Sequence, residues 1–245
     1  DKKDSTSADL EKTNFYKNLK NSKKLKIGVP KQYKNDQLSK EIVKFWELGI
    51  EFFKKNNCEI VEIDLPHTEY ALATYYIISS AEASSNLARY DGIRYGLRKN
   101  SEDINDLYEQ TRSDGFGDEV KRRILLGTHV LSAGYYDAYY GKAELARKKM
   151  REELDEVFKS VDLIVTPTTP TPAFKFGENT DPLAMYRQDI FTVPVNLTGV
   201  PAITLPMGTV ERDGTALPIG VQYIAPHAGD ARLFALGKRL YDERR

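Results

Sequence analysis

The sequence predicts an α/β protein in which helices cover a mixed β-sheet. Short apolar runs with strand character alternate with longer segments whose apolar residues recur at helical spacing. Prolines and glycines frame several of the apolar runs, most densely between residues 161 and 208. The chain has 245 residues, 40% of them hydrophobic, which is enough to bury a sizeable core as one large domain or two small ones.

The first third of the chain predicts a strand–helix–strand unit after a polar start. Residues 1–24 are rich in Lys and Asn and are expected to form a surface connector. A strand at 26–30, a helix over 37–55 and a strand at 59–65 follow, on the pattern of their apolar residues. A connection of this length favours parallel pairing of the two strands with a right-handed crossover.

The middle of the chain is expected to be helical. Residues 69–88 form a predicted helix with small residues on one face, from Ser79 to Ser85, which suits close packing against another helix or a ligand. The polar run 98–114 leads to the loop GFG. One long helix is predicted over 118–159, with a bend near Gly134 or Gly141.

The last third predicts three more strands and a helix. The strands lie at 162–167, 201–206 and 217–225, with a turn at 212–214 and an amphipathic helix after residue 230. Between the first two strands, a proline-rich loop leads into a helical turn that ends at Asp189. The segment FTVPVNL that follows has β character and is expected to be a buried strand.

Composition excludes several classes of function. Lys+Arg and Asp+Glu number 36 each, so the whole molecule has no net field that attracts nucleic acid or an anionic membrane. The single cysteine, Cys58, cannot form an internal disulfide, which favours a reducing compartment. No segment approaches the roughly 18 apolar residues of a membrane span, so we expect a soluble intracellular protein without membrane contacts.

The histidines do not form a recognisable catalytic or metal site. His67, His129 and His227 lie without a GxSxG-type nucleophile motif and without the paired spacing of zinc ligands. No phosphate-binding GxxxxGK[ST] loop occurs either. We therefore predict no metal site in this chain.

Two charged residues are placed against apolar surface. Arg123 lies on the inward margin of its helix between Gly127 and Val130, while Arg122 points away. Asp189 lies at a helix C-terminus, where the macrodipole disfavours a carboxylate unless a cation or donor is near. A guanidinium and a carboxylate so placed can bind a ligand. Structural alternatives remain open, namely an internal ion pair for Arg123 and a partner such as Arg187 for Asp189.

Seven blocks of sequence resemble the amidase-signature family and, within it, the A subunits of tRNA-dependent amidotransferases. They arrive in family order and extend over nearly the whole chain. The blocks are DSTS at 4–7, KIGVPKQY at 26–33, SAEASSNLARYDGIRYG at 80–96, GFGDEVKRRILLGT at 115–128, SAGYYDAYY at 132–140, PTTPTPAF at 167–174 and PLAMYRQDIFTVPVNLTGVPAITLP at 182–206.

The resemblance implies an incomplete C-terminal portion of an amidase-signature domain. Family members carry a catalytic Lys and two serines, the nucleophile among them, upstream of the DSTS block, which lies at the start of this chain. We therefore expect residues 1–245 to hold no catalytic residue and to be inactive alone.

The resemblance also implies a reaction and its partners. Resemblance to the amidotransferase A subunits implies that the intact subunit hydrolyses glutamine and passes ammonia to a B subunit, which uses ATP and magnesium to activate misacylated Glu-tRNA(Gln) or Asp-tRNA(Asn). A small C subunit bridges the two, and this chain itself is expected to need no cofactor. The cytoplasm or an organellar matrix is the expected location. A free-standing amidase acting on small amides, and a non-catalytic binding or scaffold module, are the alternatives.

The resemblance assigns three residues to glutamine binding. It places Arg123 on the α-carboxylate, Asp189 on the α-ammonium and Tyr75 as a hydrogen-bonding wall. Tyr76 takes the place of Tyr75 if the register differs by one residue.

Overall fold

The computed structural model describes residues 1–10, 13–15, 24–34, 38–178 and 181–243. They divide into two compact units, each built from separate stretches of chain. Unit 1 comprises residues 1–64, 154–180 and 199–245, and unit 2 comprises residues 65–153 and 181–198.

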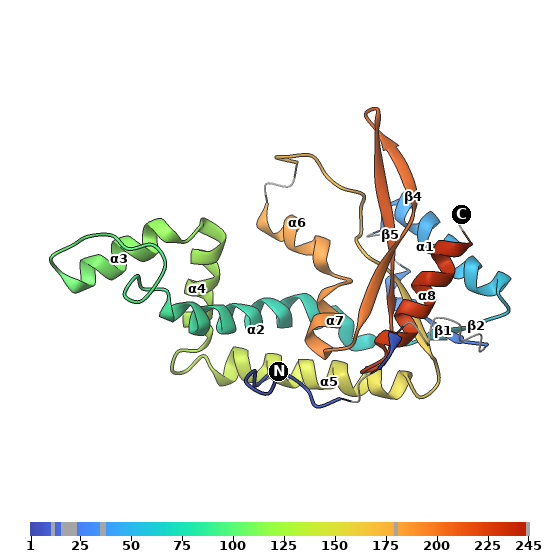
Figure 1. The fold of residues 1–245 in the computed structure, drawn as a ribbon, viewed down its shortest axis with the longest axis horizontal. Helices are drawn as coiled ribbons and strands as arrows, with labels where there is room; N and C mark the ends of the chain where they lie inside the picture. Colours follow the sequence, from blue (N-terminus) through green and yellow to red (C-terminus); the bar gives the residue numbers. More distant parts are fainter. Residues whose placement is uncertain (11–12, 16–23, 35–37, 179–180, 244–245) are drawn as a thin grey trace. The chain divides into compact units, whose positions relative to one another are not determined.

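Unit 1 contains a mixed five-stranded sheet in the order β2-β1-β3-β5-β4 (Figure 1). The strands are β1 (Lys26–Pro30), β2 (Glu59–Ile63), β3 (Leu163–Pro167), β4 (Ala202–Arg212) and β5 (Thr215–Ile224). β1 pairs in parallel with β2 and β3, whereas β5 pairs antiparallel with β3 and β4. Every residue of the central strand β3 is buried, as its continuous apolar run predicts.

Two helices pack on the same face of this sheet. In α1 (Lys40–Lys55), Gly49 lies against Val221 and the Tyr223 hydroxyl of β5, and in α8 (Asp230–Asp242), Gly237 lies against Ile203 of β4. Ile203 and Tyr223 are directly paired across the two strands, so their side chains share one face. The predicted apolar faces of both helices therefore cover this face of the sheet.

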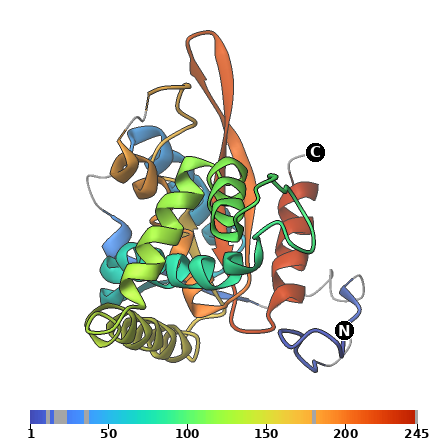
Figure 2. The same cartoon turned by 90° about the vertical axis from the view of Figure 1, so that its left-hand side faces the viewer.

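β4 and β5 form a longer hairpin than the sequence predicted. Figures 1 and 2 show it as a long twisted ribbon, and its register runs from Ala202↔Ile224 to Arg212↔Thr215. The turn residues Asp213 and Gly214 have φ angles of 52° and 74°. These positive angles are those of the tight two-residue turn that an Asp-Gly pair favours.

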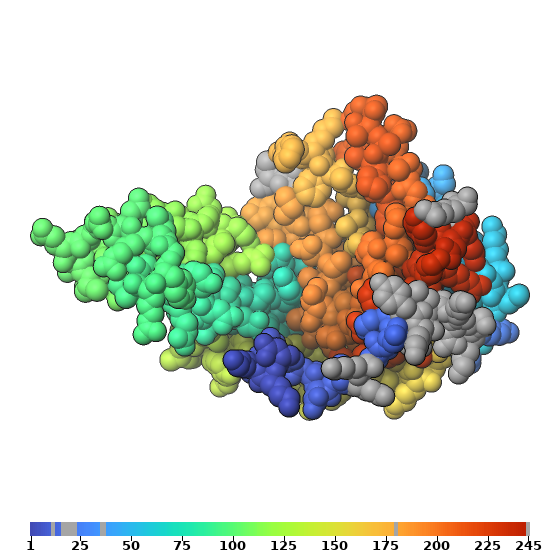
Figure 3. Space-filling model, viewed as in Figure 1, coloured from blue at the N-terminus to red at the C-terminus, as the bar shows by residue number. Residues whose placement is uncertain are grey.

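Unit 2 is helical in the residues described. Its helices are α2 (Ala71–Asn86), α3 (Ile104–Gly115), α4 (Asp118–Val130), a π-helical turn η5 (Asp137–Gly141), most of α5 (Lys142–Val157), α6 (Pro182–Tyr186), the 3-10 turn η6 (Arg187–Asp189) and α7 (Val193–Thr198). On the face shown in Figure 3, α2, α3 and α4 form one continuous body, coloured teal to green.

The prediction of one long helix over 118–159 is wrong. α4 ends at Val130, and turns and the π-helical turn separate it from α5, which begins at Lys142. Gly134 has a φ of 85°, a left-handed conformation that an α-helix cannot contain. The glycine expected to bend the helix instead interrupts it.

One helix had no prediction, and one predicted strand needs correction. Most of α3 lies in the polar run 98–114, and it begins after Asp103, whose side chain accepts hydrogen bonds from the amides of Asn105 and Asp106. The segment FTVPVNL is not a strand, because α7 occupies Val193–Thr198. Proline near the start of a helix needs no partner for its missing N–H, so Pro194 is compatible with this helix.

The predicted fold class is nevertheless correct. The mixed sheet, its strand positions and the parallel pairing of the first two strands are all present. Residues 1–10 are exposed, but residues 11–12 and 16–23 of the expected connector lie outside the described residues, so that expectation stays a prediction.

Candidate functional site

The predicted ligand-binding arginine lies on the first half of α4. The acidic residues Asp118 and Glu119 occupy the first turn of this helix, where they complement the helix dipole. Gly127 and Val130 are its buried residues, so the face predicted from sequence is the one that packs. Arg123 lies one turn before Gly127, and 30% of its side chain is exposed.

Three neighbouring side chains surround the Arg123 guanidinium. Its Nε donates to Glu119 Oε1 at 3.0 Å, and its Cζ lies 5.4 Å from the ring centre of Tyr76. Burial alone would lower the pKa of Arg123, but hydrogen bonds with Glu119 and Tyr75 raise it above its ordinary value. The group is therefore a fixed cation at any physiological pH.

Both tyrosines come from α2. Tyr75 packs against the small core formed by Ala71, Met150 and Val193, which joins α2 to α5 and α7. Its ring meets that of Tyr76 edge to face, with centres 5.2 Å apart. Tyr75 thus has a packed ring and a hydroxyl beside Arg123.

Tyr76 lies between the charged groups. Burial, followed by the charge of Asp189 and partly offset by Arg123, raises the pKa of Tyr76 to about 12. Its ring stacks on Tyr186 of α6 with centres 4.0 Å apart. The hydroxyl therefore stays protonated and available as a hydrogen-bond donor.

Asp189 is positioned by two short helical turns. The Asp181 side chain accepts hydrogen bonds from the amides of Leu183 and Ala184, and Pro182 begins α6, which runs on into η6 and Asp189. Asp189 is solvent-accessible, but partial burial of its carboxylate raises its pKa against the opposing effects of Arg123 and a hydrogen bond with Tyr76.

The cluster can bind opposite charges at two points. Arg123 acts on Asp189 through its charge, yet among the described residues no ion pair within 4.0 Å joins them. An α-amino acid has a carboxylate and an ammonium separated by one carbon, and its two charges match this pair. The cluster itself consists of arginines, carboxylates and tyrosines, so it offers binding rather than an activated nucleophile.

The structure therefore brings together Tyr75, Arg123 and Asp189, the three predicted site residues, and places Tyr76, the named alternative to Tyr75, beside Arg123 and Asp189. The ion pair considered as the alternative for Arg123 is also present, with Glu119 as its partner. For Asp189 the interacting groups are Arg123 and Tyr76 rather than Arg187.

Sequence reasoning missed Glu119 and Tyr186. Tyr186 donates its hydroxyl hydrogen to the Glu119 carboxylate, 3.0 Å from Oε1 and 3.2 Å from Oε2. Glu119 stands four residues before Arg123, a helical pairing that the sequence does display. Tyr186 could not be found in this way, because its partner is 67 residues distant in the chain.

The histidines serve local contacts where the structure describes them. His67 Nδ1 lies 2.7 Å from Glu153 Oε1, and His129 lies against the ring of Tyr135. Within the described ranges, no group of three or more His, Cys, Asp or Glu side chains is arranged to hold a metal ion. None of the helices in those ranges is long and apolar enough to cross a membrane.

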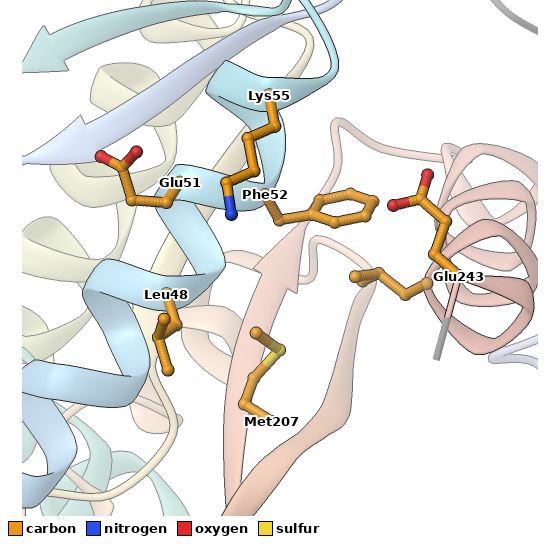
Figure 4. Close-up of a pocket in the computed structure, with 7 residues that line it drawn as sticks. Leu48, Glu51, Phe52, Lys55, Met207 and Glu243 are labelled. Carbon is orange, nitrogen blue, oxygen red and sulfur yellow. The ribbon is translucent and has the colours of Figure 1, made fainter. Parts of the chain in front are cut away.

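A separate pocket of about 270 Å³ lies in unit 1 between α1, β4 and α8. Figure 4 shows Phe52 and Met207 on its wall, with the charged side chains of Glu51, Lys55 and Glu243 around it. Its lining contains no serine, cysteine or histidine, so it offers no hydroxyl, thiol or imidazole for nucleophilic catalysis.

Comparison with known proteins identifies the family. The family described as Amidase matches residues 1–234, and the chain belongs to it. It is 57% identical over 226 residues to the A subunit of the Glutamyl-tRNA(Gln) amidotransferase of Pelagibacter ubique (strain HTCC1062), covering 91% of this chain and 46% of that protein. The corresponding protein of Thermodesulfovibrio yellowstonii is 52% identical, with 96% and 49% covered.

Solved structures agree with this assignment. The A subunit of the Glutamyl-tRNA(Gln) amidotransferase of Thermotoga maritima matches with a TM-score of 0.64 and 37% identity, over 87% of this chain and 41% of that one. A bacterial aryl acylamidase of the amidase-signature family, with a TM-score of 0.68 and 22% identity over 97% of this chain and 47% of that one, shares the fold. The chain spans about half the length of the curated relatives it matches.

Proposed function

We propose that this chain forms the glutamine-binding part of the A subunit of a tRNA-dependent amidotransferase. The names of its relatives support the subunit, and the cluster of Arg123, Asp189 and the two tyrosines supports glutamine as the ligand. The separation of a guanidinium from a partly buried carboxylate, with no ion pair between them among the described residues, is the observation that carries the proposal.

Each end of free glutamine has a partner in this arrangement. Arg123 receives the α-carboxylate, because its planar fork forms two parallel hydrogen bonds to such a group. Asp189 receives the α-ammonium. This positive charge compensates the carboxylate for the hydration that it loses through partial burial. Tyr75 and Tyr76 donate hydrogen bonds between these points, so the side-chain amide is left to extend toward the catalytic groups.

The complete subunit supplies the chemistry. A serine activated through a second serine and a lysine, all upstream of this chain, attacks the glutamine amide and releases ammonia. Water then hydrolyses the acyl-enzyme to glutamate. Ammonia passes to the B subunit, which uses ATP and magnesium on the misacylated tRNA, with a C subunit bridging the other two.

The proposal is tested in the complete subunit together with its partner subunits. Arg123→Ala and Asp189→Ala each leave one glutamine charge unpaired, which weakens binding of the transition state. We expect kcat/KM for glutamine to fall by tenfold or more, because a loss of about 1.4 kcal/mol in that binding free energy corresponds to tenfold. Amidation of tRNA with added ammonium needs no glutamine and should be retained. Arg187→Ala, an exposed substitution two residues from Asp189, is the matched control.

Two results would contradict the proposal. Wild-type glutamine kinetics in both alanine variants would remove the assigned binding roles. Equal losses with glutamine and with ammonium would show that Arg123 and Asp189 maintain the fold instead.

A further inference from the structure

The carboxylate of Glu119 lies at the centre of the hydrogen bonds around Arg123. Oε1 accepts from Arg123 Nε at 3.0 Å and from the Tyr186 hydroxyl, and Oε2 lies close to the same hydroxyl and accepts from Arg122. Burial would raise the pKa of Glu119, but the hydrogen bonds from Arg123 and Tyr186 and the charge of Arg123 hold it below its ordinary value. Glu119 is therefore ionised under all physiological conditions.

The geometry of the bond to Arg123 matters for ligand binding. A guanidinium is planar, with Nε on one side and two terminal Nη groups at the fork. Glu119 takes Nε, which fixes the plane of the group and leaves the terminal Nη groups, beside the Tyr75 hydroxyl, to receive a second carboxylate. The Tyr76 ring beside the guanidinium restricts the same group from another direction.

Tyr186 extends this arrangement to the other charged end of the site. Its hydroxyl donates to Glu119 while its ring stacks on Tyr76, and it stands three residues before Asp189 on the continuous α6–η6 segment. The Glu119–Tyr186 hydrogen bond thus connects the helix that bears Arg123 to the segment that bears Asp189.

We infer that Glu119 is a positioning residue that orients the Arg123 fork toward the carboxylate of the amino-acid ligand, with Tyr186 holding Glu119 in place. The inference rests on the proposed function and adds residues to the same site. The opposite role, in which Glu119 occupies the place of the ligand carboxylate and must be displaced, fits less well. Three side chains donate to Glu119 at once, and its bond to Arg123 uses Nε rather than the fork.

Substitutions in the complete subunit with its partners separate the two roles. We expect Glu119→Ala to raise KM for glutamine about tenfold, since it removes a charge-assisted hydrogen bond that orients Arg123, and to change kcat less. Glu119→Gln keeps an acceptor oxygen for Nε and should stay within about threefold of wild type. Asp118→Asn, at a neighbouring carboxylate whose side chain is 96% exposed, is the matched control.

Tyr186→Phe gives an independent measurement. It removes the hydroxyl and keeps the ring that stacks on Tyr76, so a smaller rise in KM, about threefold, is expected from the loss of one hydrogen bond. Amidation driven by added ammonium should be unchanged in every variant, which a loss of folding would not allow.

A double-mutant cycle tests whether Glu119 acts through Arg123. If it does, Glu119→Ala adds no further rise in KM once Arg123 has been changed to Ala. A full additional tenfold rise in that background would overturn the inference, as would an unchanged or lowered KM in the single Glu119→Ala variant. Wild-type KM in Arg123→Ala would instead overturn the proposed function, so the two failures are distinguishable.

Discussion

At the scale of single residues, the site depends on keeping the opposite charges of Arg123 and Asp189 near each other without an ion pair between them. Arg123 is held by Glu119 on one side and by the tyrosines on others, while Asp189 interacts with Tyr76 and with the charge of Arg123. Partial burial works against the charge of Asp189 and raises its pKa. The cost of that burial is relieved when a ligand ammonium pairs with the carboxylate.

The raised pKa of Asp189 predicts a pH effect on glutamine use. An acid with a raised pKa becomes protonated at a higher pH than an ordinary aspartate, so Asp189 loses its charge earlier as the pH falls. We expect kcat/KM for glutamine to fall as the pH drops and Asp189 is protonated. The rate of the ammonium-driven reaction should show no such fall. In Asp189→Asn the fall should disappear from the glutamine profile, measured by initial rates. A fall that persists in this variant belongs to another group.

The two tyrosines give separable expectations. Tyr75→Phe removes the hydroxyl beside Arg123 and keeps the ring in its core, and Tyr76→Phe removes the hydroxyl beside Asp189. Each loses one hydrogen bond, so KM for glutamine should rise by about two- to tenfold with little change in melting temperature. The larger of the two increases identifies the tyrosine that touches glutamine. No change in either variant argues against tyrosine contacts to the ligand.

At the scale of elements, the separation of Arg123 from the tyrosines is set by the crossing of α2 and α4. A Cβ added at Gly127 would lie 2.0 Å from the backbone oxygen of Ser80, so the helices meet as closely as backbone allows. Arg123 stands one turn before Gly127, and Tyr76 one turn before Ser80. The small face predicted for 79–85 is therefore a packing face that also serves the site.

Gly127→Ala tests this crossing. The methyl group forces the helices apart, and we expect a loss of stability of roughly 1–3 kcal/mol, seen as a lower midpoint of unfolding in the complete subunit. KM for glutamine should rise as well, because Arg123 and Tyr76 separate. Gly141→Ala is the control, since a Cβ there meets nothing closer than 3.8 Å. Equal unfolding midpoints for the two variants would contradict the close crossing.

At the scale of the whole molecule, the chain spans about half the length of its curated relatives, and its charged cluster contains no activated nucleophile. We predict that the purified 245-residue chain releases no glutamate from glutamine, and that activity appears when the upstream half of the subunit is joined to it. A glutaminase assay on both forms checks this, with the nucleophilic serine of the joined form changed to Ala as the control. Glutamate release by the 245-residue chain itself would refute the prediction.

Much of the fold could be predicted from local sequence, whereas the candidates Tyr75, Arg123 and Asp189 were assigned together through the family resemblance. The continuous apolar run of β3 predicts a buried strand. In α1 and α8, apolar residues recur at helical spacing because only one face of each helix is buried, so the sequence predicts amphipathic helices. α7 could not be predicted in this way, and near Gly134 the pattern predicted only a bend where the helix in fact ends. A short segment such as FTVPVNL has strand propensity, which its packing in unit 2 overrides.

The sequence by itself determined the α/β class, the family and the identity of Tyr75, Arg123 and Asp189 as candidates. Only the tertiary structure decided that these side chains meet, that Tyr76 lies between them and that Glu119 and Tyr186 hold Arg123 in place. The physical reason is range. Propensity and periodicity act over a few residues, whereas the hydrogen bond from Tyr186 to Glu119 closes a loop of 67 residues and exists only once the helices have packed.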